Sequence, residues 1–221
     1  MDNAQIQKAL QELKKQSKRK FNQSYDLIIN LKDHDVKQNP VDFFVDLHYS
    51  KGNKVKIAAF VDQLLAEQAN KFCDLTIRDT EFARYKEDKK AVRKLAQEYD
   101  YFIAQATIMP KLAAIFGKAL GSRGKMPNPK LGCVVPPSAN LEPLVKKLVT
   151  TVRLNAKKGT NLQCQVGKED LPEEQIIDNI LTIYQAVINH LPNEPHHIKD
   201  VLLKPTMGKP VRISYDKEEI I

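Results

Sequence analysis

The sequence predicts two domains of mixed helix and strand. One is an α+β split domain with an antiparallel sheet and helices, built from both ends of the chain. The other is an α/β Rossmann-like domain inserted into it. Apolar residues alternate with a period of two near both ends, strands alternate with helices in the middle, and 221 residues with 42% hydrophobic content suffice for two cores. The predicted parts are 1–50 and 150–221 for the split domain and 51–149 for the insertion.

The N-terminal part predicts a helix followed by two strands. Residues 4–18 should form an amphipathic helix that ends in a basic run, because four apolar residues fall on one helical face. These are Ile6, Ala9, Leu10 and Leu13. From Tyr25 and again from Val41 the apolar period changes to two, which predicts half-buried strands over 25–31 and 41–47.

The middle of the chain repeats a strand-then-helix unit. Strands are expected at 55–60, 75–77, 101–106 and 132–135, and helices at 62–71, at 80–98, from Pro110 onward and at 140–149. Asp62 is a plausible cap for the first of these helices. Alternating strands and helices predict a small parallel sheet covered on both faces.

The C-terminal part returns to an antiparallel pattern. Strands over 151–157 and 162–166 are joined by a predicted turn at 158–161, and a long helix follows over 172–190. Its expected core face is Ile176, Ile177, Ile180, Leu181, Tyr184, Val187 and Ile188. Two short strands, 198–204 and 211–214, then flank a turn at 205–208.

Composition indicates a basic protein of a reducing compartment. Lys and Arg total 35 against 27 Asp and Glu, so the net charge is +8 and a polyanion is a natural partner; a merely solvated basic surface is the alternative. Cys73, Cys133 and Cys164 show no paired spacing and are expected to be small buried residues. We expect neither a signal peptide nor a membrane span, and hence a soluble cytoplasmic protein.

No motif of an enzyme is present. The five histidines show no spacing typical of a metal site or a catalytic triad, and no glycine-rich turn for a dinucleotide follows the strand that ends at Phe60. The sequence therefore predicts no catalytic residue, no metal and no cofactor.

Two segments of the split domain are candidates for RNA binding. The run that includes Lys18 and Lys20 ends in Phe21, just before Ser24, and basic charge beside an aromatic ring suits RNA. A solvated helix end with Phe21 in the core is the alternative. The second candidate is the turn Thr206, Met207, Gly208 and Lys209, which combines a hydroxyl, an apolar group, a close backbone approach and a charge. A tight turn with Met207 in the core is the alternative.

A third candidate is the basic loop of residues 121–125, which holds Arg123 and Lys125. Two residues separate its glycines, where a Walker loop needs four, and Met126 follows the lysine. The proline-rich segment after it does not suit the second helix of a K-homology module. A surface loop remains, which either contacts RNA or only connects two units.

The chain resembles a known family, the L-one family of large-subunit ribosomal proteins, in its archaeal form. Four segments carry the resemblance over nearly the full length. They are Lys20-Phe21-Asn22-Gln23-Ser24 with 26–31, Gly124-Lys125-Met126-Pro127-Asn128-Pro129, Val166-Gly167-Lys168, and Thr206-Met207-Gly208.

The resemblance implies a fold, a partner and a site. It implies a split domain with the main RNA site, a Rossmann-like insertion as a secondary contact, and two hinge strands near 50–54 and 149–152. By position, the main site would comprise Lys20, Phe21, Ser24, Thr206, Met207 and Gly208, with Lys18 and Lys209 beside them, and the secondary contact Arg123 and Lys125. Family members bind large-subunit rRNA as monomers, help release deacylated tRNA from the exit site, and repress translation of their own mRNA.

Two other functions compete with this one. A metabolic enzyme with a cofactor in the inserted domain would need the glycine-rich turn that is missing after the first strand. A non-ribosomal RNA-binding translational regulator would use the same surface, so the residues alone leave it open.

Overall fold

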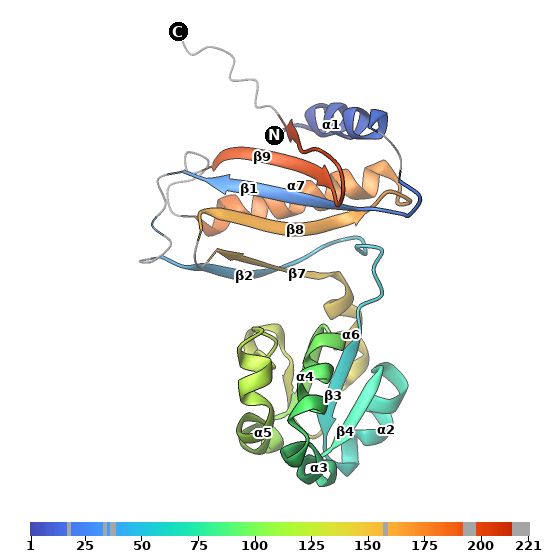
Figure 1. The fold of residues 1–221 in the computed structure, drawn as a ribbon, viewed down its shortest axis with the longest axis vertical. Helices are drawn as coiled ribbons and strands as arrows, with labels where there is room; N and C mark the ends of the chain where they lie inside the picture. The colour runs from blue at the N-terminus through green and yellow to red at the C-terminus, as the bar shows by residue number, and fades with distance from the viewer. Residues whose placement is uncertain (17–18, 33–34, 36–38, 157–158, 192–197, 214–221) are drawn as a thin grey trace. The chain divides into compact units, whose positions relative to one another are not determined.

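The computed structural model describes residues 1–16, 19–32, 35, 39–156, 159–191 and 198–213 (Figure 1). Its contacts divide the chain into two compact units. Residues 1–53 with 150–221 form the terminal unit, and residues 54–149 form the inserted unit. Helices accompany antiparallel strands in the first and parallel strands in the second.

In its described residues, the terminal unit contains two antiparallel sheets. Its elements are α1 (Asn3–Lys15), β1 (Ser24–Leu31), β2 (Val41–Asp46), β7 (Thr151–Ala156), β8 (Asn161–Lys168), α7 (Glu173–His190), β9 (Ile198–Pro205) and β10 (Val211–Ile213). Four strands pair in the order β10-β9-β1-β8, and β2 pairs with β7. Strand β1, from the N-terminal part, is therefore central between two strands from the C-terminal part, so both chain ends contribute to the four-stranded sheet.

One face of the four-stranded sheet is buried beneath helices. In β1 the side chains of Tyr25, Leu27, Ile29 and Leu31 are buried, while the residues between them are half-exposed on the other face. Helices α1 and α7 contact each other and pack on the strands. The four predicted core residues of α1 are all buried. In α7 the predicted core face is confirmed, except that Leu181 and Ile188 are half-buried, and Asn179 and Ile183 are buried in addition.

The inserted unit is a four-stranded parallel sheet with helices. Its strands are β3 (Ile57–Val61), β4 (Leu75–Arg78), β5 (Tyr101–Gln105) and β6 (Val134–Val135), in the order β4-β3-β5-β6. Its helices are α2 (Gln63–Phe72), α3 (Phe82–Glu87), α4 (Lys89–Glu98), α5 (Met109–Gly121) and α6 (Leu141–Thr150). Three short 3-10 turns accompany them: Asp79–Glu81, Ala106–Ile108 and Pro129–Leu131. Strand β3 is buried at every position, as a strand with covered faces must be.

Three predictions on local structure need correction. The helix predicted over 80–98 is broken, because the Asp88 carboxylate accepts hydrogen bonds from the amides of Lys90 and Ala91 and so caps a new helix. Helix α1 ends at Lys15, and the residues 17–18 predicted to extend it lie outside the described part. Cys73 is half-buried, whereas Cys133 and Cys164 are buried as expected. Asp62 does cap α2, by accepting from the Gln63 amide.

Candidate RNA-binding site

The predicted turn after β9 is a tight loop on the surface of the terminal unit. The Gly208 amide donates to the Pro205 carbonyl oxygen over 3.1 Å, which closes the turn, and Thr206 donates to the Ser24 carbonyl oxygen through its amide and its hydroxyl. Ser24 and Thr206, far apart in the chain, thus lie side by side. Met207 at the tip is 60% exposed, so the alternative that it belongs to the core is wrong.

Position 208 requires glycine because the ring of Pro205 lies too close for a Cβ atom. A Cβ atom there would lie 2.3 Å from Cγ of Pro205 and 2.8 Å from Oε1 of Gln16. A proline ring cannot move aside as the end of a flexible side chain can, so any larger residue would displace the turn.

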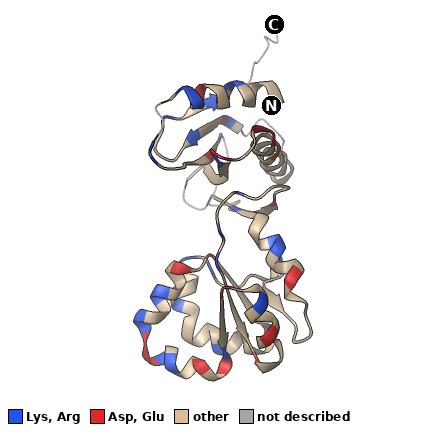
Figure 2. Ribbon diagram, turned by 90° about the vertical axis from the view of Figure 1, so that its right-hand side faces the viewer, with Lys and Arg blue, Asp and Glu red and all other residues tan. Residues whose placement is uncertain are grey.

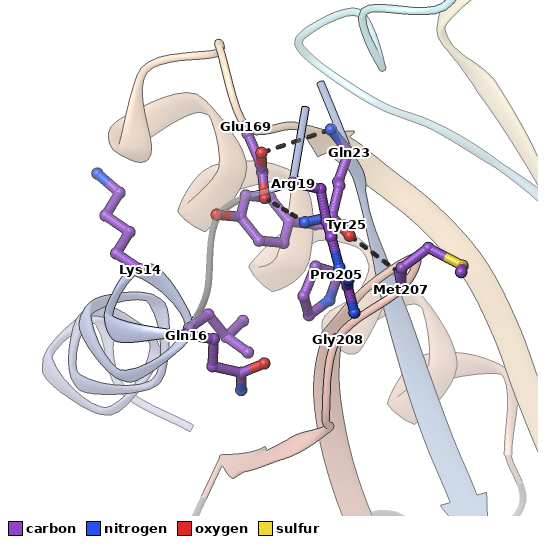
Figure 3. Close-up of a pocket in the computed structure, with 10 residues that line it drawn as sticks. Lys14, Gln16, Arg19, Gln23, Tyr25, Glu169, Pro205, Met207 and Gly208 are labelled. Atoms are coloured by element: carbon purple, nitrogen blue, oxygen red, sulfur yellow. Dashed lines mark hydrogen bonds between the residues drawn. The ribbon is translucent and has the colours of Figure 1, made fainter. Parts of the chain in front are cut away.

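Two glutamines hold this turn in place. Oε1 of Gln16, at the end of α1, accepts from the Lys209 amide, and Nε2 of Gln16 donates to the Lys209 carbonyl oxygen, both over 3.0 Å. Gln23, just before β1, accepts from the Met207 amide through Oε1 over 3.0 Å and donates to Glu169 through Nε2 over 3.1 Å (Figure 3). With 4% of its surface exposed, Gln23 is one of the few buried polar residues in the described part of the chain. The turn is therefore fixed from two sides before any ligand arrives.

A pocket of about 400 Å³ lies beside the turn (Figure 3). Its lining is Leu13, Lys14, Gln16, Arg19, Gln23, Tyr25, Glu169, Pro205, Met207 and Gly208. Lys14 forms an ion pair with Glu173 of α7. Burial, helped by the negative charges of Glu169 and Glu173, raises the pKa of Tyr25 above its ordinary value of 10.0, so its hydroxyl stays protonated at neutral pH. The lining combines apolar surface with hydrogen-bond donors and acceptors.

Lys20 and Phe21 lie in the sequence between Arg19 and Gln23, which both line this pocket. Phe21 is 53% exposed, so the alternative that places its ring in the core is wrong as well. Lys20 is exposed, and Ser24 accepts from the Gln165 amide group through its hydroxyl. Lys18 lies outside the described residues. Lys209 is exposed, with its backbone held by Gln16.

The two candidate residues of the inserted unit are engaged with its own backbone. Nζ of Lys125 donates to the Tyr99 carbonyl oxygen over 2.7 Å, and the Arg123 guanidinium donates to the Ala119 carbonyl oxygen over 3.2 Å. The loop that carries them begins where α5 ends, at Gly121. These contacts fix the loop, and they leave Arg123 exposed.

The sequence profile of the Ribosomal protein L1p/L10e family matches residues 13–209. The chain belongs to this family. It is 39% identical over 216 residues to the large ribosomal subunit protein uL1 of Pyrococcus abyssi, covering 96% of both chains. The uL1 proteins of Nanoarchaeum equitans and Methanocaldococcus jannaschii are 38% identical over 200 residues and 36% over 220, covering 89% and 98% of this chain and 93% and 98% of theirs.

Membership of the ribosomal protein L1p/L10e family settles the class of protein. The chain is archaeal in type, and its family consists of structural, non-enzymatic ribosomal components. The prediction that it is not an enzyme is thereby confirmed. Among the described residues, no cluster of histidine, cysteine and carboxylate side chains could hold a metal ion. No helix in the described ranges is long and apolar enough to cross a membrane.

Sequence reasoning missed the two glutamines and Glu169. For Gln23 a signal existed, since continuing the alternation of β1 backwards from Tyr25 puts position 23 on the buried face, where a polar residue needs a partner. Gln16 gave no such signal, because its partner Lys209 is 193 residues away.

Proposed function

We propose that the protein is an rRNA-binding component of the large ribosomal subunit, located in the cytoplasm, and that the terminal unit carries its main RNA site. The residues in contact would be Lys18, Lys20, Phe21, Ser24, Thr206, Met207, Gly208 and Lys209. The observation that carries this proposal is the turn fixed by Gln16 and Gln23, which exposes Met207 to solvent. A rigid turn loses little conformational entropy on binding, so its contacts contribute fully to affinity.

The chemistry of the site suits sugar and base edges more than phosphates. By sequence, residues 1–53 and 150–221 hold 18 Lys and Arg against 17 Asp and Glu and carry a net charge of only +1. Met207 and Phe21 offer apolar surface, and the nearby glutamines and backbone groups offer hydrogen bonds. RNA is recognised largely by shape, by its 2′-hydroxyl groups and by stacking at irregular positions, which favours a helical junction as the ligand.

The finer roles in this proposal are those that the family resemblance implies. In the proposed role, the protein acts as a monomer within the ribosome, assists release of deacylated tRNA from the exit site, and represses translation by binding a similar structure in its own mRNA. Arg123 and Lys125 of the inserted unit would supply the secondary RNA contact. The second candidate is a non-ribosomal RNA-binding regulator, which the same turn would serve.

Co-sedimentation with large ribosomal subunits tests the main proposal. Gly208→Ala must displace the turn, so we expect it to lose most binding both to subunits and to an isolated rRNA junction, with the fold retained. Gly117→Ala is the matched control, because a Cβ atom at Gly117 would meet nothing within 4 Å. Equal subunit binding by both variants would contradict the assigned site. If the unchanged protein binds the rRNA junction but does not co-sediment with large subunits, the result would instead support a non-ribosomal RNA-binding regulator.

A further inference from the structure

The positive charge of the protein lies almost entirely in the inserted unit. Residues 54–149 hold 17 Lys and Arg against 10 Asp and Glu, a net charge of +7 out of the total of +8. The unit with the preformed turn is therefore nearly neutral, and the unit without it is strongly basic. Because phosphate binding depends on cations, this distribution calls for a polyanion at the inserted unit itself.

Helix α4 concentrates this charge on one side. With 100° per residue, the exposed positions Lys89, Lys90, Arg93, Lys94 and Gln97 occupy an arc of about 140° that contains no acidic residue. The opposite side, with Val92, Leu95 and Ala96, is buried in the core. The packing of that side fixes the cationic arc toward solvent, and Figure 2 shows where Lys and Arg recur along the helices of this unit.

Two of the acidic residues next to α4 are engaged elsewhere, and a third, Glu87, belongs to α3. Asp88 uses its carboxylate to cap the helix, and Glu98 binds Nζ of Lys56 over 3.1 Å. Within the part of the chain that the structure describes, no ion pair or hydrogen bond joins the side chains of Lys89, Lys90, Arg93 or Lys94 to another residue. Other lysines of the unit do have partners, such as Lys111 with Asp79 and Lys146 with Glu142.

This arrangement is unfavourable for an isolated helix in two ways. Lys89–Arg93 and Lys90–Lys94 are like-charged pairs at i and i+4, which repel each other. Lys89 and Lys90 also stand in the first turn, where the helix dipole favours anions. A bound phosphate would reverse the sign of both effects. The Asp88 carboxylate at the N-terminus of α4 offsets part of the second effect, but no described contact offsets the repulsion between the cations. Such an uncompensated arrangement is typical of a functional surface.

We propose that this cationic arc of α4, formed by Lys89, Lys90, Arg93 and Lys94, binds the phosphate backbone of duplex RNA. The two tracks Lys89–Arg93 and Lys90–Lys94 run along the helix about 100° apart, and each spans about 6 Å. They suit the two phosphate rows that border the deep, narrow major groove of an A-form duplex. Single-stranded RNA is the poorer fit, because proteins bind it through aromatic stacking surfaces and the arc holds no aromatic residue.

The test uses the full-length protein and a 20-base-pair RNA duplex without bulge or junction, titrated over a series of salt concentrations. The variant replaces all four cations of the arc with glutamine. The matched control replaces Lys54, Lys56, Lys111 and Lys146 with glutamine, which removes the same charge from lysines of the same unit that already have acidic partners. We expect the arc variant to lower the salt slope of duplex binding by about three to four, and the control by less than about one.

The remaining outcomes are equally decisive. Thermal unfolding of the arc variant at the same or a slightly higher temperature, with at least tenfold weaker duplex binding, supports the proposal. Equal effects of both variants would mean that net charge alone acts, and would overturn it. A greater loss for single-stranded RNA, or an equal loss for an acidic polypeptide such as polyglutamate, would also overturn it. Because the duplex lacks a junction, Gly208→Ala should leave this binding intact, so failure here does not touch the proposed site at the turn.

Discussion

Replacing Gln23 with methionine should loosen the Met207 turn and weaken RNA binding at the same time. The change keeps the length of the side chain and its burial but removes both of its hydrogen bonds, to Glu169 and from the Met207 amide. A hydrogen bond to a charged partner contributes about 1.5–3 kcal/mol, and one between neutral groups about 1 kcal/mol. Glu169 is exposed and regains water, so we expect a loss of about 1.5–3 kcal/mol in the free energy of unfolding.

The same change should reduce affinity for the rRNA junction by about tenfold, or about 1.4 kcal/mol, since the turn must then be ordered on binding. Amide hydrogen exchange provides the direct readout: the Met207 amide should be protected in the natural protein and exchange rapidly in Gln23→Met. The control is Gln163→Met on β8, where the glutamine is exposed. If Gln23→Met unfolds more easily while the Met207 amide stays protected and junction affinity is unchanged, Gln23 does not position the turn, and the reasoning is refuted.

Four further predictions address the site, the domain and the titrating groups. Met207→Ala should weaken junction binding by about 1–3 kcal/mol with little change in the salt slope, whereas Lys20→Gln should lower the salt slope by about one. Loss of the fold in Met207→Ala would contradict the exposed position of Met207. Residues 1–50 joined by a short linker to 151–221 should fold and keep most junction affinity. The ends to be joined lie together, since the Leu47 amide donates to the Thr150 carbonyl oxygen over 3.2 Å. Weaker junction binding than that of the inserted unit alone would contradict this prediction. Burial raises the pKa of the Asp26 carboxyl group, partly opposed by the charge of Lys204, so the folded state disfavours the charged form. Asp26→Asn should therefore raise the unfolding temperature at pH 7. This gain should vanish as the pH falls below 3.8, where Asp26 is protonated in both the folded and the unfolded state. Burial raises the pKa of Cys73 and Cys133 to about 11 and of Cys164 to about 12, so at pH 8 a thiol reagent should modify half-buried Cys73 first and Cys164 only on unfolding.

Much of the fold could be predicted because its signals are local. The alternation of Tyr25, Leu27, Ile29 and Leu31 is a property of eight consecutive residues, and it decides which face of β1 is buried. The break between α3 and α4 was missed although a signal was present. Asp88 stands within a charged run that suits a helix surface, and its role as a cap depends on whether its carboxylate turns back to the Lys90 amide.

The site itself was predicted only in part, because its geometry depends on partners that are distant in the chain. The composition of the turn at 206–209 predicts a contact surface, and the exposure of Met207 agrees with that. What holds the turn, however, is Gln23, 184 residues earlier, and Gln16, 193 residues before Lys209. No pattern along the sequence links positions so far apart. A buried amide side chain needs hydrogen-bond partners, so the sequence could have indicated that Gln23 has such partners, but not which ones.

Under the two proposals, the terminal and inserted units bind RNA through two different kinds of interaction. In the terminal unit, hydrogen bonds and close packing fix a nearly neutral surface, which can distinguish one RNA shape from another but attracts RNA weakly over distance. In the inserted unit, the unpaired cations of α4 attract any duplex, with a strength that falls as salt rises. Removing the arc should therefore slow association with rRNA and leave the preference for the junction intact, whereas Gly208→Ala should abolish the preference and leave fast association. Stopped-flow binding in low and high salt separates the two, and a loss of preference in the arc variant would show that specificity is not confined to the turn.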